Sequence, residues 1–251
     1  MRFITLLLAL AVALPAWSRE VVRVGGYEFA PYVEVQNQKP SGLTIELIDQ
    51  LNRIQDRYTF QFEPTSPRRR YEDFLSGRID IIFFESADWG WRTRKIKFSS
   101  TREFLRDSEV FVALDADGRD ERYFSSLGGH TIAGVYGYHY AFTGFNDDPK
   151  VLEQDYKMSL VYNNFASLQL VLSGRADMAV VTRSYLDRFL RENPDAGAQL
   201  LVSKRTDQVY SLRALIREKS GITVDQIEAL LTQLRQRGIL DKLWRSAGII
   251  N

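Results

Sequence analysis

Two distant segments of the sequence repeat one pattern, and this repeat limits the possible folds more than any other feature. Residues 74–85 read FLSGRIDIIFFE and residues 171–182 read VLSGRADMAVVT. Each predicts a helix that ends at a C-capping glycine, followed by an aspartate that hydrogen-bonds the local backbone and opens a buried strand. Two copies are too few for a solenoid, so the repeat predicts two similar lobes.

Strands and helices alternate around both copies of the pattern. The predicted strands are 21–26, 58–63, 79–85, 109–114, 130–135, 159–163, 176–182 and 209–216, and the predicted helices are 41–55 with Ser41 as its cap, 66–77, 165–174, 184–193, 223–238 and 239–248. Such alternation is typical of α/β lobes in which helices cover a mostly parallel sheet.

The first eighteen residues have the pattern of a secretory signal peptide. Arg2 precedes an apolar run from Phe3 to Leu14, and Pro15 and small residues follow. The run is shorter than the roughly 20 residues that a membrane-spanning helix needs, so we expect cleavage before Arg19 rather than an anchor. The chain has no cysteine for a disulfide or a lipid anchor, which favours a soluble protein of a Gram-negative periplasm, with secretion as the alternative.

Composition and motifs argue against several functions. The 33 Lys and Arg residues nearly balance the 32 Asp and Glu residues, so no nucleic-acid partner is expected. The sequence contains no nucleophile elbow, zinc-protease motif or phosphate loop, and His130 and His139 have no carboxylate at metal-ligand spacing. We therefore expect no catalytic residue, no metal and no cofactor.

Residues 83–100 are the strongest candidate for a binding wall. Glu85 stands at the predicted carboxyl end of a buried strand, where ligands bind in open α/β sheets. It is either a cap for the following turn or an acceptor for a ligand ammonium. Trp89 and Trp91 provide one core side chain and one flat wall. Arg92 and Arg94 have planar guanidinium groups whose paired N–H donors suit a carboxylate, and composition does not show which of the two would bind it.

Two other segments have both a structural and a functional interpretation. Residues 68–70 are three arginines at the start of a predicted helix, and they form either a solvated face or, at the helix N-terminus, an anion site. Residues 136–140 follow a strand and combine Gly137 with Tyr138, His139 and two further tyrosines. They either cover a lobe surface or bring backbone N–H groups close to an anion.

Taken together, an ordered set of motifs resembles the periplasmic solute-binding proteins of ABC importers, polar amino acid type (bacterial solute-binding protein family 3). The set is FAPY at 29–32, SGLTIELIDQLN at 41–52, LSGRID at 75–80, WRTRKIKFSS at 91–100, GVYGYHY at 134–140, LSGRADMAV at 172–180 and LTQLRQRGILDKLWRSAG at 231–248. The resemblance covers nearly the whole mature chain. It implies the two-lobed type 2 periplasmic-binding-protein fold, with two crossover strands that join the lobes.

The resemblance also implies boundaries for the two lobes. Residues 19–108 and 210–251 would form lobe 1, and residues 109–209 would form lobe 2. The chain would close over its ligand by bending at the crossovers.

Three site residues carry over from the family by position. Phe29 matches the aromatic residue that packs over the ligand, and Arg92, six residues before Phe98, matches the arginine that clamps the ligand carboxylate. Tyr138 stands where the family usually has a threonine, so its backbone N–H could still bind the carboxylate while the hydroxyl is displaced.

Two positions depart from the family pattern. Thr182 replaces the aspartate that holds the ligand ammonium, and Ala87, next to Ser86, replaces a Ser or Thr. A neutral hydroxyl is a weaker partner for an ammonium group than a carboxylate. Either Glu85 supplies the missing negative charge or the ligand lacks an ammonium.

The sequence therefore predicts a monomer that encloses a small carboxylate-bearing solute, an amino acid or a related compound, for delivery to an ABC permease. The predicted ligand-binding residues are Phe29, Arg70, Glu85, Ser86, Trp89, Arg92, Tyr138, His139 and Thr182. Two alternatives stay open: a ligand-sensing subunit for a membrane receptor, and an enzyme that resembles cyclohexadienyl dehydratases, with Glu85 as its acid or base.

Overall fold

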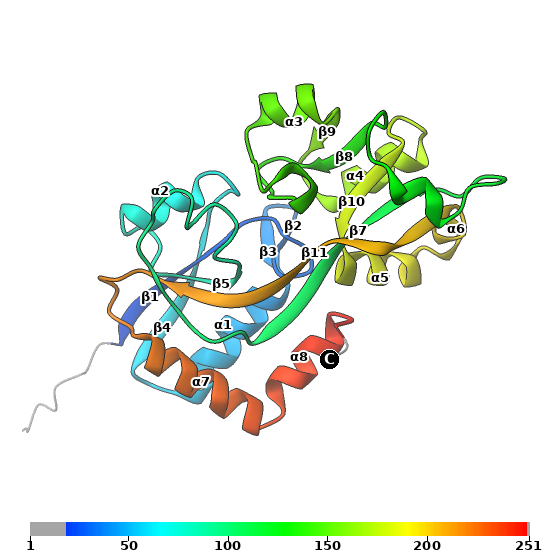
Figure 1. Cartoon of the computed structure of the whole chain (residues 1–251). Coiled ribbons are helices and arrows are strands. Elements are labelled where there is room, and N and C mark those ends of the chain that lie inside the picture. Colours follow the sequence, from blue (N-terminus) through cyan, green and yellow to red (C-terminus); the bar gives the residue numbers. More distant parts are fainter. Residues whose placement is uncertain (1–18, 250–251) are drawn as a thin grey trace, which may run out of the picture.

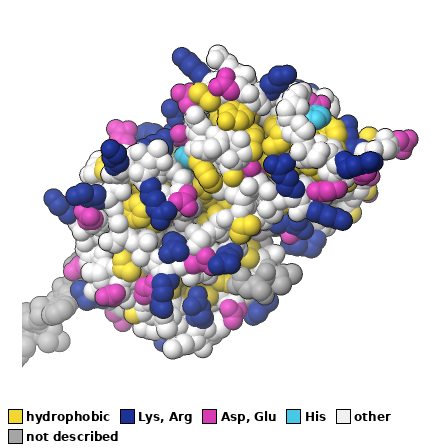
Figure 2. Space-filling model, viewed as in Figure 1, with side chains coloured by type: hydrophobic (Ala, Val, Ile, Leu, Met, Phe, Trp, Pro, Cys, Tyr) yellow, Lys and Arg dark blue, Asp and Glu magenta, His cyan; other side chains and the backbone are white. Residues whose placement is uncertain are grey.

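A computed structural model describes residues 19–249 as two α/β lobes that are linked by a pair of long strands (Figure 1). The predicted signal peptide lies outside the described residues. Lys and Arg side chains alternate with Asp and Glu side chains over the face shown in Figure 2. No helix within residues 19–249 is long and apolar enough to cross a membrane.

The first lobe is built on three parallel strands. β1 (Glu20–Gly26) lies between β4 (Tyr58–Pro64) and β5 (Ile81–Glu85). Figure 1 shows α2 (Arg70–Leu75) on one side of this sheet and α1 (Leu43–Ile54), α7 (Val224–Gln236) and α8 (Ile239–Ser246) on the other. The short strands β2 (Glu34–Gln36) and β3 (Lys39–Ser41) form a hairpin before α1.

The second lobe has the same plan. β8 (Ile132–Val135) lies between β9 (Met158–Val161) and β10 (Met178–Thr182), and all three strands are parallel. The helices of this lobe are α3 (Pro149–Asp155), α4 (Asn164–Leu172), α5 (Arg183–Glu192) and α6 (Pro194–Gly197), with short 3₁₀ turns at Glu121–Ser125 and Ala141–Thr143.

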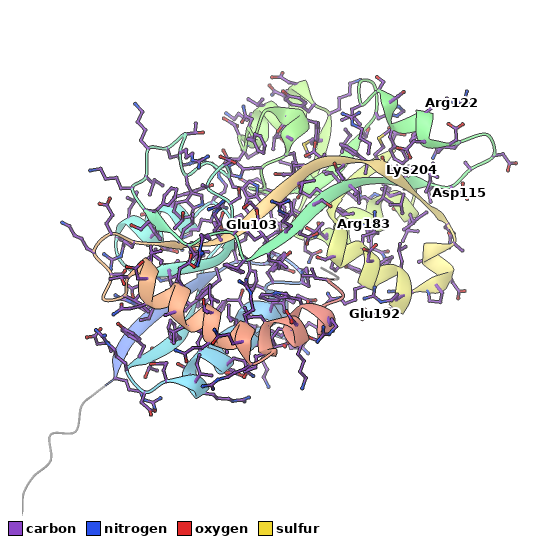
Figure 3. The ribbon with its side chains drawn as sticks, turned by 60° about the horizontal axis from the view of Figure 1, so that its bottom comes forward. Glu103, Asp115, Arg122, Arg183, Glu192 and Lys204 are labelled. Atoms are coloured by element: carbon purple, nitrogen blue, oxygen red, sulfur yellow. The ribbon has the colours of Figure 1, made fainter. Side chains whose placement is uncertain are left out.

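Two antiparallel strands connect the lobes. β7 (Leu105–Leu114) pairs with β10 in the second lobe, and β11 (Leu200–Ile216) pairs with β7 over most of its length and then with β5 and β6 (Ser99–Ser100) in the first lobe. Figure 3 shows the two long strands side by side, from near Glu103 to near Asp115 and Lys204. These are the predicted crossovers, and the two-lobed fold with mixed, mostly parallel sheets is confirmed.

The repeated sequence pattern has the same structure in both lobes. Gly77 and Gly174 follow α2 and α4 with φ values of 79° and 68°, the left-handed conformation of a C-capping glycine. The aspartates act differently from the prediction. Asp80 accepts a hydrogen bond from the backbone N–H of Arg23 (3.0 Å) and Asp177 from that of Thr131 (2.7 Å), so each ties its strand to a neighbouring chain segment instead of to local backbone.

Two predicted helix starts were wrong. Ser41 ends β3, and Gly42 occupies the N-cap position of α1 without a side-chain cap. The helix predicted from residue 66 begins only at Arg70, because residues 67–69 form turns in which Ser66 Oγ accepts from the N–H of Arg69 (3.2 Å). This later start makes Arg70 the first residue of α2.

Candidate ligand site between the lobes

A cavity lies where the two lobes face each other. Its walls come from the segment after β1, from α2 and the turn after β5, from β7, and from the loop after β8. The residues that line it are Tyr27, Phe29, Arg70, Trp89, Glu109, Gly137, Tyr138 and His139. The free space inside is about 10 Å³, which is enough for about one water molecule. In this conformation the lobes are therefore closed tightly over the site.

Arg70 and Glu85 form a buried ion pair beside the cavity. Arg70 Nε lies 3.5 Å from Glu85 Oε1, and both side chains are only 1% exposed. Glu85 also accepts hydrogen bonds from Trp91 Nε1 (3.0 Å) and from the hydroxyl of Tyr27 (3.2 Å). Burial raises the pKa of Glu85, and the nearby charge of Arg70 opposes this rise.

The guanidinium of Arg70 is held by the protein, and its Nε faces Glu85 without forming a hydrogen bond to any described residue. Its Nη groups donate to the carbonyls of Pro67 and Trp89, and its Cζ lies 4.5 Å from the ring centre of Tyr71. Within residues 19–249, Arg70 Nε and His139 Nδ1 are buried without a hydrogen-bond partner. Unpaired buried polar atoms are rare in proteins, so these two atoms mark the cavity as a place for a polar ligand.

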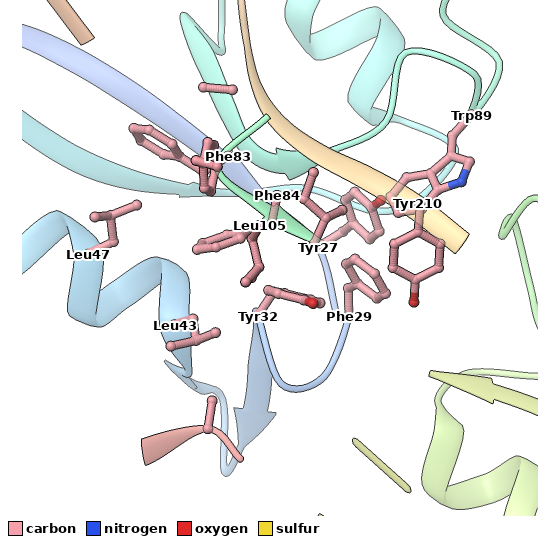
Figure 4. Close-up of a cluster of buried hydrophobic side chains, with 14 of the residues drawn as sticks. Tyr27, Phe29, Tyr32, Leu43, Leu47, Phe83, Phe84, Trp89, Leu105 and Tyr210 are labelled. Carbon is pink, nitrogen blue, oxygen red and sulfur yellow. The ribbon is translucent and has the colours of Figure 1, made fainter. Parts of the chain in front are cut away.

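Aromatic side chains form the other walls, and Figure 4 shows three of them, Tyr27, Phe29 and Trp89. The ring of Phe29 lies edge-on to Trp89, 5.5 Å between centres, and edge-on to Tyr138 at 5.6 Å. The hydroxyl of Tyr138, from the second lobe, donates to the carbonyl of Glu28 in the first lobe (2.8 Å). A ligand here would be enclosed by rings from both lobes.

Glu109 is a cavity residue that our sequence analysis missed. It stands on β7 and is 3% exposed, with Oε2 accepting a hydrogen bond from Gln208 Nε2 at 2.6 Å. Burial and the charge of Asp207 raise its pKa well above the usual value. An acidic residue directly before the apolar run of residues 110–114 was the available signal. Tyr27 was missed as well.

His139 is buried and uncharged at neutral pH. Its Nε2 lies 3.4 Å from the hydroxyl of Tyr71. Burial, reinforced by the charge of Arg70, lowers the pKa of His139 to about 3. The ring therefore offers hydrogen bonds but no charge to a ligand.

The structure leaves four of the predicted residues outside the cavity lining. One is Glu85, whose ion pair with Arg70 lies beside the cavity; the others are Ser86, Arg92 and Thr182. Arg92 has a side chain that is 69% exposed and pairs with Asp88 (2.5 Å), because the buried rings of Trp89 and Trp91 on the same turn leave it on the solvent side. Ser86 Oγ accepts from the N–H of Asp88 (3.3 Å), and Thr182 Oγ1 accepts from Asn164 Nδ2 (3.1 Å). Both are buried next to the site, and each already has a partner.

Ion pairs join the lobes on both flanks of the cavity. On one flank, the Nη2 of Arg94 contacts both carboxylate oxygens of Asp147, at 2.8 and 2.7 Å. On the other, Arg188 of α5 makes a bidentate pair with Glu34 of β2, at 2.7 Å for each contact. These pairs hold the lobes together around the site.

A cavity enclosed by two lobes that are joined by two crossing strands is typical of the class of two-lobed solute-binding proteins. The model for bacterial extracellular solute-binding proteins, family 3, matches residues 22–246, and the chain belongs to this family. A search of curated proteins found no significant match.

Solved structures with the same fold include proteins of different roles. An ancestral arginine-binding protein bound to arginine is 18% identical, with a TM-score of 0.68 and coverage of 91% of this chain and 98% of that chain. A histidine kinase sensor domain with similarity to periplasmic binding proteins is 19% identical (TM-score 0.69, coverage 92% and 96%). AncCDT-1, an ancestral amino-acid-binding protein and precursor of cyclohexadienyl dehydratase, is 18% identical (TM-score 0.66, coverage 90% and 94%).

Proposed function

We propose that this chain binds a small carboxylate-bearing solute in the cavity between its lobes, with Arg70 as the anchor for the carboxylate. The main support is the buried Nε of Arg70, a permanently charged donor that lies 3.5 Å from Glu85 Oε1 but makes no hydrogen bond within residues 19–249. A carboxylate oxygen would satisfy this donor, and Phe29, Trp89 and Tyr138 would contact the body of the solute. Arg70 thus takes the role that the family resemblance implies for Arg92.

Binding requires the lobes to separate first, because the closed cavity leaves room for about one water molecule. We propose that residues 19–108 and 210–251 move as one body and residues 109–209 as the other, by bending in β7 and β11. Between Val202 and Gln208 the register of β11 against β7 is irregular, which places a weakly paired segment close to the crossing. Bending there would open the site without breaking either core.

The biological role that we propose is delivery of the closed complex to an ABC permease from the periplasm, after removal of residues 1–18. Amino-terminal sequencing of the protein from an osmotic-shock fraction should begin at Arg19. Delivery to a membrane sensor would use the same binding step. A stable uptake defect for the solute in a deletion strain supports transport, whereas normal uptake with a lost transcriptional response supports sensing.

We propose that no chemistry follows binding. In the dehydratase alternative, Glu85 would act as acid or base, but its carboxylate is committed to Arg70, Trp91 and Tyr27. Turnover of prephenate or arogenate by the purified protein would contradict this proposal.

A thermal-shift screen over amino acids, organic acids, polyamines and short peptides tests the binding function. A solute at about a hundred times its dissociation constant adds roughly 2.7 kcal/mol to the free energy of unfolding. We expect a carboxylate-bearing hit whose effect survives Arg92→Ala and is lost in Arg70→Met/Glu85→Gln, which leaves no unpaired charge. A hit that loses its effect in Arg92→Ala but keeps it in the double variant would return the carboxylate anchor to Arg92.

A further inference from the structure

The acidic side chain that lines the cavity, Glu109, has no cationic partner in the described part of the chain. Within residues 19–249, Glu109 has no Lys, Arg or His nitrogen within 4.0 Å of its carboxyl oxygens, in contrast to Glu85 with its Arg70. A buried acid without a cation is costly when ionised and holds a proton instead. Glu109 therefore presents a neutral carboxylic acid to the cavity in the closed, unliganded conformation.

Strand pairing fixes the direction in which Glu109 points. In the antiparallel ladders, Glu109 stands directly opposite Gln208 of β11 on one side and opposite Thr182 of β10 on the other. Directly opposed residues carry their side chains on the same face of a sheet. Glu109, Gln208 and Thr182 thus form a polar row on one face of the sheet, and Glu109 is the member that lines the cavity.

Gln208 links this row to both lobes. Its Nε2 donates to Glu109 Oε2 and to the carbonyl of His139, each at 2.6 Å, and its Oε1 accepts from Trp89 Nε1 at 3.1 Å. Both ends of the amide are therefore in use, and Gln208 holds Glu109 at a fixed position while Trp89 closes over it. The hydrogen bond to Gln208 uses one carboxyl oxygen only.

The other acids around Glu109 already have hydrogen-bond partners, so Glu109 is the acid that can accept a positive charge from a ligand. The ionisable groups that interact with it or share its cavity are Asp107 on β7, Asp207 and Tyr210 on β11, Tyr27 after β1, Tyr138, His139 and Tyr140 after β8, and Arg70 on α2. Asp207 accepts from the N–H groups of Ala141 and Phe142, and Asp107 from Ser184 and Tyr32. Both of these acids have partners, whereas Glu109 has only the amide.

We propose that Glu109 binds an ammonium group of the solute and that this ammonium replaces the proton of the Glu109 carboxyl group. The exchange is balanced: the protonated acid releases one proton to solvent, and the carboxylate that remains pairs with the bound ammonium. The total charge of the occupied site is the same as for a carboxylate-only solute bound beside the protonated acid. The ligand class is then a compound with both a carboxylate for Arg70 and an ammonium for Glu109.

This inference rests on the proposed function, and calorimetry separates the two. Matched triplets share one carbon skeleton: L-alanine, L-lactate and propionate, or L-phenylalanine, L-phenyllactate and 3-phenylpropionate. Each is titrated into the wild type in phosphate and in Tris at the same pH. For the triplet that binds, we expect binding of the amino acid to release about one proton from the protein, and its affinity to increase about tenfold for each unit of rising pH. Binding of the other two members should release no proton.

Glu109→Gln keeps the shape and the hydrogen bond to Gln208, and Glu46→Gln on the exposed face of α1 is its matched control. We expect Glu109→Gln to abolish proton release and to weaken the amino acid 10- to 100-fold, with little change for the two analogues. An amino acid that binds without proton release overturns the role of Glu109 and leaves the proposed function intact. This result comes from the wild type, so it holds even if the variant does not fold. If no triplet member or other carboxylate binds, both proposals fail.

Discussion

Arg70 and Glu85 lie 3.5 Å apart, Nε to Oε1, in a pair that is almost fully removed from water. Removal of one member of a buried pair leaves an uncompensated charge and typically costs about 3–5 kcal/mol. We predict that Glu85→Gln lowers the free energy of unfolding by roughly this amount. Urea denaturation at pH 7 measures it, with Asp88→Asn, which breaks the exposed pair with Arg92, as a control that should cost less than about 1 kcal/mol.

The double variant Arg70→Met/Glu85→Gln tests whether this cost comes from the unpaired charge. The glutamine oxygen remains an acceptor for Trp91 Nε1, its NH₂ group can donate to the Tyr27 hydroxyl oxygen, and the methionine fills part of the guanidinium volume. We predict that most of the lost stability returns in the double variant, so that the two substitutions are strongly non-additive. Additive losses would show that packing, and not charge pairing, explains the single variant.

The buried His139 makes stability fall in mild acid. Its pKa is about 6.5 in the unfolded chain and is lowered to about 3 in the folded protein. Between these values the unfolded state binds the proton and the folded state does not, so stability is retained above pH 6.5 and lost as the pH falls. We expect this group to contribute a loss of roughly 1–2 kcal/mol between pH 6.5 and 5.

Comparison with His139→Gln isolates that contribution, because buried acids such as Glu109 titrate with the opposite sign. The free-energy difference between wild type and His139→Gln should shrink as the pH falls from 7 to 5. His130→Gln changes the other histidine and serves as the control. A difference that is constant with pH would mean that His139 does not resist protonation in the folded state.

The pair of Arg188 with Glu34 joins the lobes away from the cavity. We predict that Glu34→Gln raises the radius of gyration of the unliganded protein in small-angle scattering and weakens solute binding by about two- to fivefold, the effect of one partly exposed ion pair. Glu228→Gln breaks a comparable pair with Arg102 inside the first lobe. Equal effects of the two substitutions would argue against a closing role for Glu34.

Much of this architecture could be predicted because local patterns encode it. The helix-Gly-Arg-x-Asp-strand repeat predicted two lobes, and the apolar runs predicted most strands of both sheets, but not residues 200–208 of β11 or the short strand β6. The repeat did not reveal that Asp80 and Asp177 accept hydrogen bonds from the backbone of a neighbouring chain segment, because the order of the strands in the sheet decides which segment lies beside each aspartate. Ser41 does not cap α1 because it is the last residue of β3 and pairs with Glu34 in the hairpin of β2 and β3.

The site was harder to predict than the fold. The structure gathers Phe29, Arg70, Trp89, Tyr138 and His139 around one cavity, and their places at strand and helix ends made them candidates. The family resemblance assigned the ligand carboxylate to Arg92, whereas we propose Arg70, because spacing along a turn does not tell which side chain faces solvent. Glu109 was hidden in a strand, and only pairing with two other strands shows that it faces the cavity.

A crystal structure of the protein with its best carboxylate-bearing hit tests the central claim most directly. We predict a solute enclosed between the lobes, with a carboxylate oxygen within hydrogen-bond distance of Arg70 Nε and the rings of Phe29, Trp89 and Tyr138 against its body. A solute whose carboxylate contacts Arg92, or that lies outside this cavity while Arg70 Nε stays unpartnered, would contradict it.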